Sequence, residues 1–234
     1  MKFINDNITL YNGDSNKIVP TLDKHDLMLL DPPFDEWDKV NYKLTKNIIA
    51  FCNPQSRHIV ENILGKPRTE LVWHFADGRW VSKNLPRITH DYIYIYGDVS
   101  NASVGEKQKI KTVNKGISSI GKDKLGSRRY TPNDRKQLNS VQIYPRNMSN
   151  PLGAWGKPYQ LIYNLLAWLK PESVLDPYAG SGVTMEACIN LNIKCTGIEI
   201  DEKHFNIAKD KITKTSSQKD IFRDLYKNQQ LQLY

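Results

Sequence analysis

The sequence has few cysteines and no pattern of cysteines or histidines that would hold a metal ion. Among its 234 residues there are three cysteines, Cys52, Cys188 and Cys195. No two of them form a C-x-x-C pair, which argues against a disulfide framework or a zinc site and fits a reducing, cytoplasmic location. The five histidines are scattered, and none lies in an H-E-x-x-H or H-x-E context, so we predict no metal site.

Long hydrophobic runs are also absent. The longest apolar stretches are far shorter than the ~20 residues that cross a membrane, and the N-terminus shows no signal-peptide pattern. With 39% apolar and 25% charged residues, the composition is that of a soluble globular protein without membrane association. The length fits one domain with an insertion better than two domains.

Positive charge is concentrated in one segment. The whole chain carries a net charge of +8, and residues 98–150 contain eleven Lys and Arg against four Asp and Glu, a net charge of +7. A basic block on a balanced body is what a polyanion such as DNA requires, because neutralising its phosphates releases counterions. A solvated loop of low hydrophobicity has the same composition, so this alternative stays open.

Strand and helix patterns alternate along the chain. Short runs rich in β-branched and aromatic residues predict strands, and apolar residues spaced by three and four positions predict helices. Such alternation indicates an α/β fold, a Rossmann-like doubly wound and mostly parallel sheet with helices on both faces. The predicted strands span residues 8–11, 26–30, 47–52, 69–75, 90–96, 173–175 and 194–200, and the predicted helices span residues 55–64, 158–169, 183–190 and 202–213.

A glycine-rich stretch, "LDPYAGSGVT", follows one predicted strand. Asp176 ends the strand, and Gly180 and Gly182 allow a tight turn and the close approach of a ligand to the backbone. Glu199 ends the next strand, where a nucleotide-binding unit places the acid that holds ribose hydroxyls. The stretch lacks the third glycine of a dinucleotide fold, the Gly-Lys-Ser/Thr of a P-loop and the first glycine of a hydrolase elbow. After these exclusions, a nucleoside-type ligand without a pyrophosphate is left, and S-adenosylmethionine fits that description. A plain strand–helix turn is the alternative.

A second unusual stretch, "LLDPPF", ends another predicted strand. Methylation of an adenine amine requires hydrogen-bond acceptors that draw the nitrogen lone pair out of the ring. Asp31 and the carbonyl of Pro32 or Pro33 would supply them, and the prolines would fix the direction of that carbonyl. The ring of Phe34 would stack on a base flipped out of the duplex. A simple strand-ending turn is the alternative.

Together, "DPPF" and "DPYAGSG" resemble the catalytic and cofactor motifs of the DNA amino-methyltransferases, and their order resembles the permuted β class. The stretches "YNGDSNKIVPTL", "ITHDYIYIYGD", "GKPYQLIYNLL" and "GIEIDEKHFNIAKDKI" continue the resemblance over most of residues 8–213. It implies a catalytic half at 1–97, a basic target-recognition insert at 98–150, a cofactor-binding half at 151–213 and a C-terminal tail at 214–234.

The resemblance also implies roles for single residues. The tetrapeptide from Asp31 to Phe34 would be catalytic, and Glu199 would hold the ribose of S-adenosylmethionine. Phe34 departs from the family, which more often has Tyr there; the ring is kept and a hydroxyl is lost. The cofactor-binding residues would be Asp14, Lys157, Pro158, Asp176, Tyr178, Gly180, Ser181, Gly182 and Glu199, and the DNA-binding residues Lys122, Lys124, Arg128, Arg129 and Arg135.

The target stays open between two bases. Relatives that methylate the cytosine amine usually carry Ser where this chain has Asp31, which favours adenine in double-stranded DNA. Methylation of cytosine N4, methylation of RNA or of a small molecule, and a catalytically silent nucleic-acid binder are the alternatives. The tail has apolar residues at partly helical spacing, which fits docking on the body or on a second subunit of a homodimer. A partner nuclease cannot be inferred from the sequence.

Overall fold

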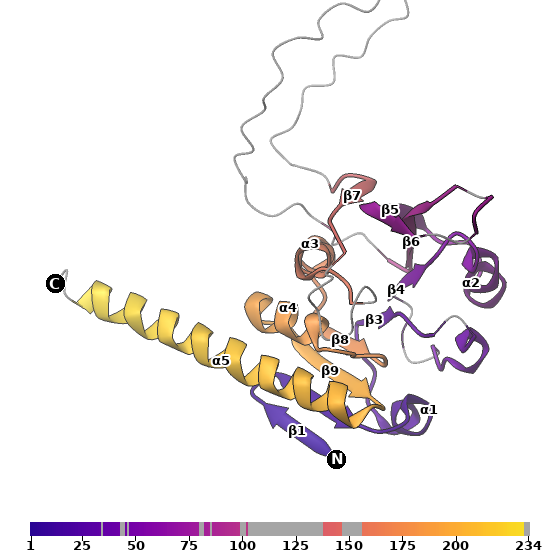
Figure 1. Ribbon diagram of the computed structural model, residues 1–234. Coiled ribbons are helices and arrows are strands. Elements are labelled where there is room, and N and C mark those ends of the chain that lie inside the picture. Colours follow the sequence, from indigo (N-terminus) through magenta and orange to yellow (C-terminus); the bar gives the residue numbers. More distant parts are fainter. Residues whose placement is uncertain are drawn as a thin grey trace, which may run out of the picture.

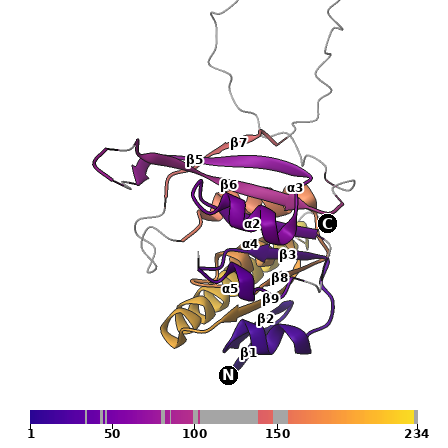
Figure 2. The same cartoon turned by 90° about the vertical axis from the view of Figure 1, so that its right-hand side faces the viewer.

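We analysed a computed structural model of the chain, which describes residues 1–33, 35–42, 45, 47–79, 82–84, 86–98, 102, 138–146 and 156–231. In this part of the chain nine strands form one sheet, with helices packed on it (Figures 1 and 2). The strands are β1 (Lys2–Asn5), β2 (Ile8–Asn12), β3 (Leu27–Leu30), β4 (Asn47–Cys52), β5 (Thr69–Arg79), β6 (Ile88–Tyr96), β7 (Val141–Ile143), β8 (Ser173–Asp176) and β9 (Lys194–Glu199). The helices are α1 (Ser15–Ile18), α2 (Arg57–Leu64), α3 (Tyr159–Leu169), α4 (Val183–Leu191) and α5 (Glu202–Leu231).

The sheet order is β1-β2-β9-β8-β3-β4-β6-β5-β7. The run β2-β9-β8-β3-β4 is parallel, whereas β1 and β6 are antiparallel to their neighbours. At its centre β3 pairs with β8, with Leu27 opposite Val174 and Met28 opposite Leu175. The predicted catalytic strand and the predicted cofactor strand are therefore neighbours, although more than 140 residues separate them in the sequence.

Side chains alternate between two cores, one on each face of the sheet. Leu27 and Leu29 of β3 belong to the core that packs under α3, α4 and the start of α5. Met28 and Leu30 belong to the core on the other face, with Val60 of α2. All four residues of β3 are buried, because a central parallel strand is covered on both faces. The residues that follow Leu30 are thus held in a fixed position at the carboxyl ends of the parallel strands.

The predicted fold class and its predicted strands and helices are confirmed, with differences at the edges. The pattern missed β1 and β7, two edge strands of four and three residues, because so short a segment shows little alternation. The last helix was placed too short, since α5 continues from Glu202 to Leu231 and projects from the body (Figure 1). Residues 214–220 contain no apolar residue, so the apolar spacing of the helix breaks off there, and the apolar residues of the tail beyond them are only partly helical in spacing.

No helix in the described residues is long and apolar enough to cross a membrane.

Candidate active site

A cavity of about 880 Å³ opens at the edge of the sheet where the parallel strands have their carboxyl ends. In an open α/β sheet this is the edge at which ligands bind. Its size lies in the range of about 300–1,000 Å³ that is usual for small-molecule sites. The lining residues are Gly13–Asn16, Asp31–Pro33, Asp35, Glu36, Phe51–Asn53, Trp73, Asp91, Arg146, Lys157, Pro177, Tyr178, Gly180, Ile198–Ile200 and His204.

The loop after β3 presents Asp31 to this cavity. The N–H of Glu36 donates to the carbonyl of Pro33 at 3.0 Å, which closes a turn directly after the two prolines. Trp37, 1% exposed, anchors the far end of the turn in the core beside α2. The side chain of Asp31 keeps 30% of its surface exposed, so its carboxylate is held in place and still accessible.

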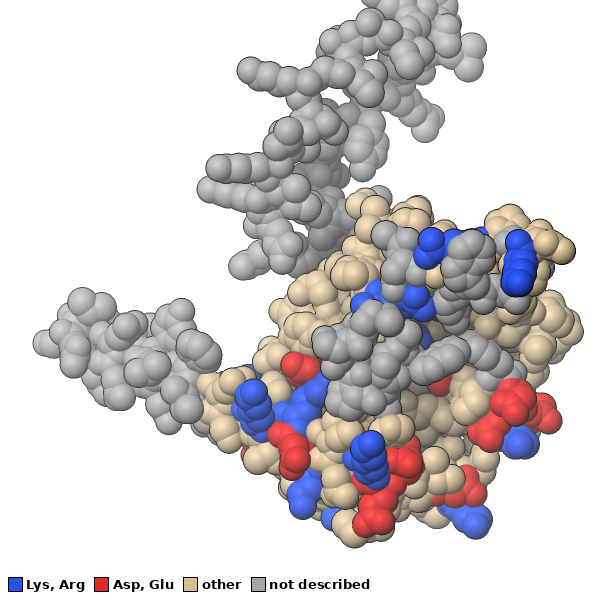
Figure 3. All heavy atoms as spheres, viewed as in Figure 1, with Lys and Arg blue, Asp and Glu red and all other residues tan. Residues whose placement is uncertain are grey.

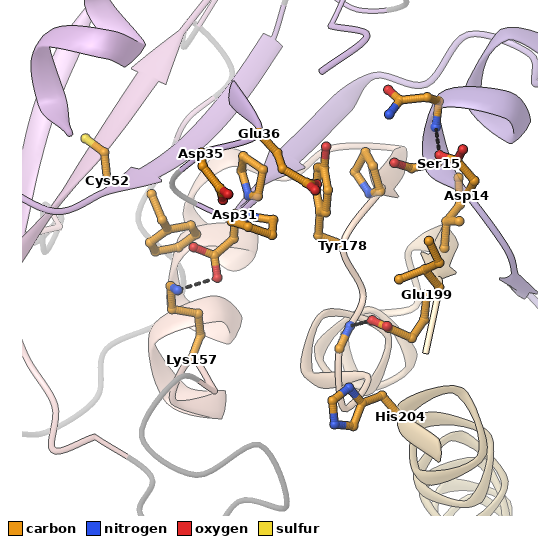
Figure 4. Close-up of a pocket in the computed structure, with 18 of the residues that line it drawn as sticks. Asp14, Ser15, Asp31, Asp35, Glu36, Cys52, Lys157, Tyr178, Glu199 and His204 are labelled. Atoms are coloured by element: carbon orange, nitrogen blue, oxygen red, sulfur yellow. Dashed lines mark hydrogen bonds and ion pairs between the residues drawn. The ribbon is translucent and has the colours of Figure 1, made fainter. Parts of the chain in front are cut away.

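Lys157 forms an ion pair with Asp31, its ammonium donating to Oδ2 of the carboxylate (Figure 4). Lys157 lies just before Pro158, the residue that caps the N-terminus of α3. Its Nζ lies 5.1 Å from the centre of the Phe51 ring and 5.9 Å from that of the Trp73 ring. The ammonium is therefore surrounded by one carboxylate and two aromatic rings, and its side chain is only 14% exposed.

The glycine turn after β8 is held by Glu199 through backbone hydrogen bonds. The N–H of Gly180 donates to Oε2 of Glu199 at 2.7 Å, and the N–H of Asp201 donates to Oε1 at 2.8 Å. Gly180 lies in the loop after β8, and Glu199, at one side of the cavity in Figure 4, ends the neighbouring strand β9. At 8% exposure Glu199 is almost fully buried, yet it still borders the cavity.

Asp176 lies beneath the turn and does not border the cavity. Its carboxylate accepts a hydrogen bond from the N–H of Tyr178 at 3.1 Å and one from the side chain of Thr184. Burial raises the pKa of Asp176 to about 7, a shift that these hydrogen bonds oppose and that the nearby charges of Asp31 and Glu199 increase. Asp176 is a structural support of the turn whose charge changes near neutral pH.

Two glycines allow α4 to pack closely on its neighbours. Gly182, with a φ of 81°, begins α4, and a Cβ there would lie 2.9 Å from the Cβ of Ala208 in α5. A Cβ on Gly197 of β9 would lie 2.5 Å from the sulfur of Met185. In a dinucleotide fold, the third glycine lies on the helix and allows it to approach the strand. Here the small residue at this contact is Gly197 on the strand, so Met185 fits on the helix at the position of the third glycine.

Comparison with known proteins agrees with this arrangement. The profile of a DNA methylase family of the N6-adenine and N4-cytosine type matches residues 34–210, most of the chain. The chain belongs to this DNA methylase family. Among curated proteins, the type II methyltransferase M.SmaI of Serratia marcescens is 27% identical over 151 residues, 62% of this chain. The match spans 46% of that relative, so this chain corresponds to about half of its length.

Solved structures of methylases share the fold. The crystal structure of the M1.HpyAVI–SAM complex has a TM-score of 0.60 at 18% identity, covering 88% of this chain and 98% of that one. The cytosine-N4-specific PvuII DNA methyltransferase has a TM-score of 0.57 at 11% identity, covering 90% of this chain and 92% of that one. At these identities the similarity concerns the fold.

The methylase residues that the sequence singles out fall into three groups. Eight of the eighteen border the cavity: Asp14, Asp31, Pro32, Pro33, Lys157, Tyr178, Gly180 and Glu199. Four lie beside or beneath it, namely Pro158, Asp176, Ser181 and Gly182. Phe34 and the predicted DNA-binding residues Lys122, Lys124, Arg128, Arg129 and Arg135 lie outside the described residues. The individual roles stay predictions.

Sequence reasoning missed one side of the methylase cavity. Phe51 and Asn53 border it because β4 runs parallel to β3 and ends on the same side of the sheet. The predicted strand at residues 47–52 already indicated this. Trp73 of β5 also borders it. Arg146 belongs to the basic segment predicted to bind DNA but was not singled out, and His204 lies within a helix pattern and carried no signal.

Proposed function

We propose that this protein transfers a methyl group from S-adenosylmethionine to the exocyclic N6 amine of an adenine flipped out of double-stranded DNA. The observation that carries the proposal is the arrangement of Asp31 and Glu199 at opposite sides of one cavity (Figure 4). The first is suited to accept hydrogen bonds from an amine, and the second to hold the hydroxyls of a nucleoside.

The cofactor side of the cavity suits S-adenosylmethionine. Glu199 and Asp14 supply acceptors for a nucleoside, and Gly180 lets the ligand approach the backbone. Six carboxylates border the cavity, which favours a ligand that carries a positive charge: Asp14, Asp31, Asp35, Glu36, Asp91 and Glu199. When bound, S-adenosylmethionine supplies an activated methyl group on a positively charged sulfur.

At the other side Asp31 accepts a hydrogen bond from the amine and draws its lone pair out of the ring. The carbonyl of Pro33 is already engaged by Glu36, so we assign the second acceptor to the carbonyl of Pro32. The amine nitrogen would gain the methyl carbon as the bond from that carbon to the cofactor sulfur breaks, which leaves S-adenosylhomocysteine. The nitrogen loses one proton, and Asp31 accepts it as positive charge builds on the nitrogen. Phe51 and Trp73 border the same region, with their rings beside Lys157.

Mass spectrometry of nucleosides tests the proposal. Unmethylated duplex DNA is incubated with the protein and S-adenosylmethionine and then digested to nucleosides. We expect N6-methyladenine, and none when Asp31→Ala replaces the wild type. Detection of N4-methylcytosine instead would transfer the proposal to the cytosine amine, the specificity of the PvuII enzyme. Cofactor binding without any modified base in DNA would contradict the proposal and favour RNA methylation or a silent binder.

A further inference from the structure

The ion pair between Lys157 and Asp31 joins segments that lie far apart in the chain. Lys157 is in the turn before α3, and Asp31 ends the central strand β3. The ammonium donates to only one of the two carboxylate oxygens, Oδ2. Within the described residues no hydrogen bond to Oδ1 is found, so this oxygen can accept one from an amine. An unpaired carboxylate at a strand end could rotate and present either oxygen.

The groups around this pair are mostly negative, so Asp31 depends on Lys157 for a neighbouring positive charge. Among the described residues that border the cavity, six carry carboxylates, and only Lys157 and Arg146 carry a permanent positive charge. Asp176, on the neighbouring strand β8, adds a further negative charge when it is ionised. Without a cation beside it, Asp31 would face mainly negative groups and would turn away from them or towards solvent.

The position of Lys157 is itself fixed. Its ammonium lies near the faces of the Phe51 and Trp73 rings, so it gains cation–π attraction on two sides while it bonds to Asp31. The indole N–H of Trp73 donates to the carbonyl of Tyr144 at 2.9 Å. The hydroxyl of Tyr144 accepts a hydrogen bond from Asn164 of α3 at 2.5 Å. The Trp73 ring is thus braced by the residue after β7 and, through that residue, by α3.

We propose that Lys157 is a positioning residue of the methyl-transfer reaction: it fixes one oxygen of Asp31 so that the other oxygen faces the substrate amine. The inference rests on the proposed role of Asp31. It differs from the cofactor-binding role that the sequence resemblance implies for Lys157. In a cofactor-binding role the ammonium would be directed at the ligand, whereas here it is directed at the carboxylate of Asp31 (Figure 4).

Steady-state kinetics and calorimetry of Lys157→Met test this role. We expect kcat to fall by about 10²-fold, the size of effect that loss of orientation at a reacting group produces. The KM for DNA and the Kd for S-adenosylhomocysteine, measured calorimetrically, should stay within about twofold of the wild type, because Met fills the same space between the rings. Lys157→Arg, which can also pair with Asp31, should restore part of kcat. Lys157→Gln serves as a second variant if Met impairs folding.

Lys209→Met is the matched control. Lys209 also lies over an aromatic ring, with its Nζ 5.6 Å from the centre of the Phe3 ring, but it does not border the cavity. Its substitution should leave kcat unchanged. A higher Kd with an unchanged kcat at saturating cofactor would overturn the inference and return Lys157 to a cofactor-binding role. Unchanged kcat and Kd in Lys157→Met would also overturn it.

NMR of the protein labelled with ¹³C-lysine separates this inference from the proposed function. Ring currents from Phe51 and Trp73 should shift the ε-CH₂ signal of Lys157, which is assigned by its loss in Lys157→Arg. Asp31→Asn should move that signal and leave the signal of Lys209 in place. If it does not move, the pair does not exist in solution and the inference fails. If it moves but the wild type methylates no DNA, the pair stands and the proposed function fails.

Discussion

The two sides of the cavity are built in different ways. On the cofactor side, the backbone N–H groups of Gly180 and Asp201 bind Glu199, and the participating loops follow the adjacent strands β8 and β9. On the catalytic side, Asp31 is held by the side chain of Lys157, which in turn lies against the rings of β4 and β5.

The backbone hydrogen bonds to Glu199 thus help to hold the fold, whereas the side-chain pair of Lys157 and Asp31 serves the proposed chemistry. Changes to the cofactor side should affect stability and ligand affinity together, because the same hydrogen bonds form the turn and the binding surface. Changes to Asp31 and Lys157 should affect turnover alone, since both side chains are partly exposed and lie outside the backbone network. Measurements of kcat, Kd and stability on one set of variants test whether the two sides respond to substitution in these different ways.

The largest expected effect is that of Asp31→Asn. It keeps the shape of the side chain and removes the charge that, in the proposed function, accepts the amine proton, so kcat should fall by on the order of 10³-fold. The calorimetric Kd for S-adenosylhomocysteine and the melting temperature should stay close to those of the wild type. Asp38→Asn, at an exposed site in the same loop, is the control that should leave kcat unchanged. A large rise in Kd for Asp31→Asn would contradict the separation of the two sides.

Asp176 should make stability depend on pH. Its pKa is raised from 3.8 to about 7 in the folded protein, so the folded state keeps a proton that the unfolded state loses. The stability gained from that proton is complete below about pH 4 and is lost as pH rises to about 7. Asp176→Asn lacks this loss and should gain on the order of 4 kcal/mol relative to wild type between those limits. Urea unfolding at several pH values measures the difference.

Asp210→Asn, an exposed position on α5, is the control for that series and should follow the wild type at every pH. A constant difference between Asp176→Asn and wild type across the whole range would show that Asp176 stays charged.

Glu199→Gln should affect both the fold and the ligand. The amide of Gln offers one acceptor oxygen to two N–H donors, those of Gly180 and Asp201, so one of them loses its partner. The free energy of unfolding should fall by about 2–3 kcal/mol, because hydrogen bonds to charged groups contribute about 1.5–3 kcal/mol each. The Kd for S-adenosylhomocysteine should rise together with this loss. Weaker binding at unchanged stability would contradict the shared backbone network.

The smallest expected effect is that of Trp73→Phe. It keeps a ring beside Lys157 but removes the hydrogen bond to the carbonyl of Tyr144, worth about 1 kcal/mol. If that bond steadies the ring that holds Lys157, kcat should fall by about fivefold at unchanged Kd. Trp168→Phe, on α3 away from the cavity, should leave kcat unchanged. Equal kcat values for the two variants would contradict a role for the Trp73 ring.

The same contrast explains how much of the site the sequence could predict. The turn at Gly180 and the acid at Glu199 lie within one strand–helix–strand unit, so their spacing along the chain reflects their distance in space. The catalytic side joins the ends of β3, β4 and β5 with a residue before α3, and pairings between such distant segments leave no mark in local spacing. Asp31 itself could be predicted, but the side chain that holds it could not.

Edges of the fold were hard to predict for a related reason. Central strands such as β3 and β4 are buried on both faces and read as continuous apolar runs. The edge strands β1 and β7 are short and partly exposed, and α5 extends into a polar region. In each of these, hydrogen bonding rather than hydrophobic burial defines the element, and a hydrophobic pattern does not report it.

The pairing of β3 with β8 also has a consequence for folding during synthesis. Met28 of β3 can pair with Leu175 of β8 only after the ribosome has synthesised the residues between them. At a synthesis rate of about 5–20 residues per second, that delay lasts roughly 7–30 s. During this time β3, apolar on both faces, lacks one of its neighbours. The nascent chain therefore carries an unpaired, apolar strand edge during this time, and such edges favour aggregation and the binding of chaperones.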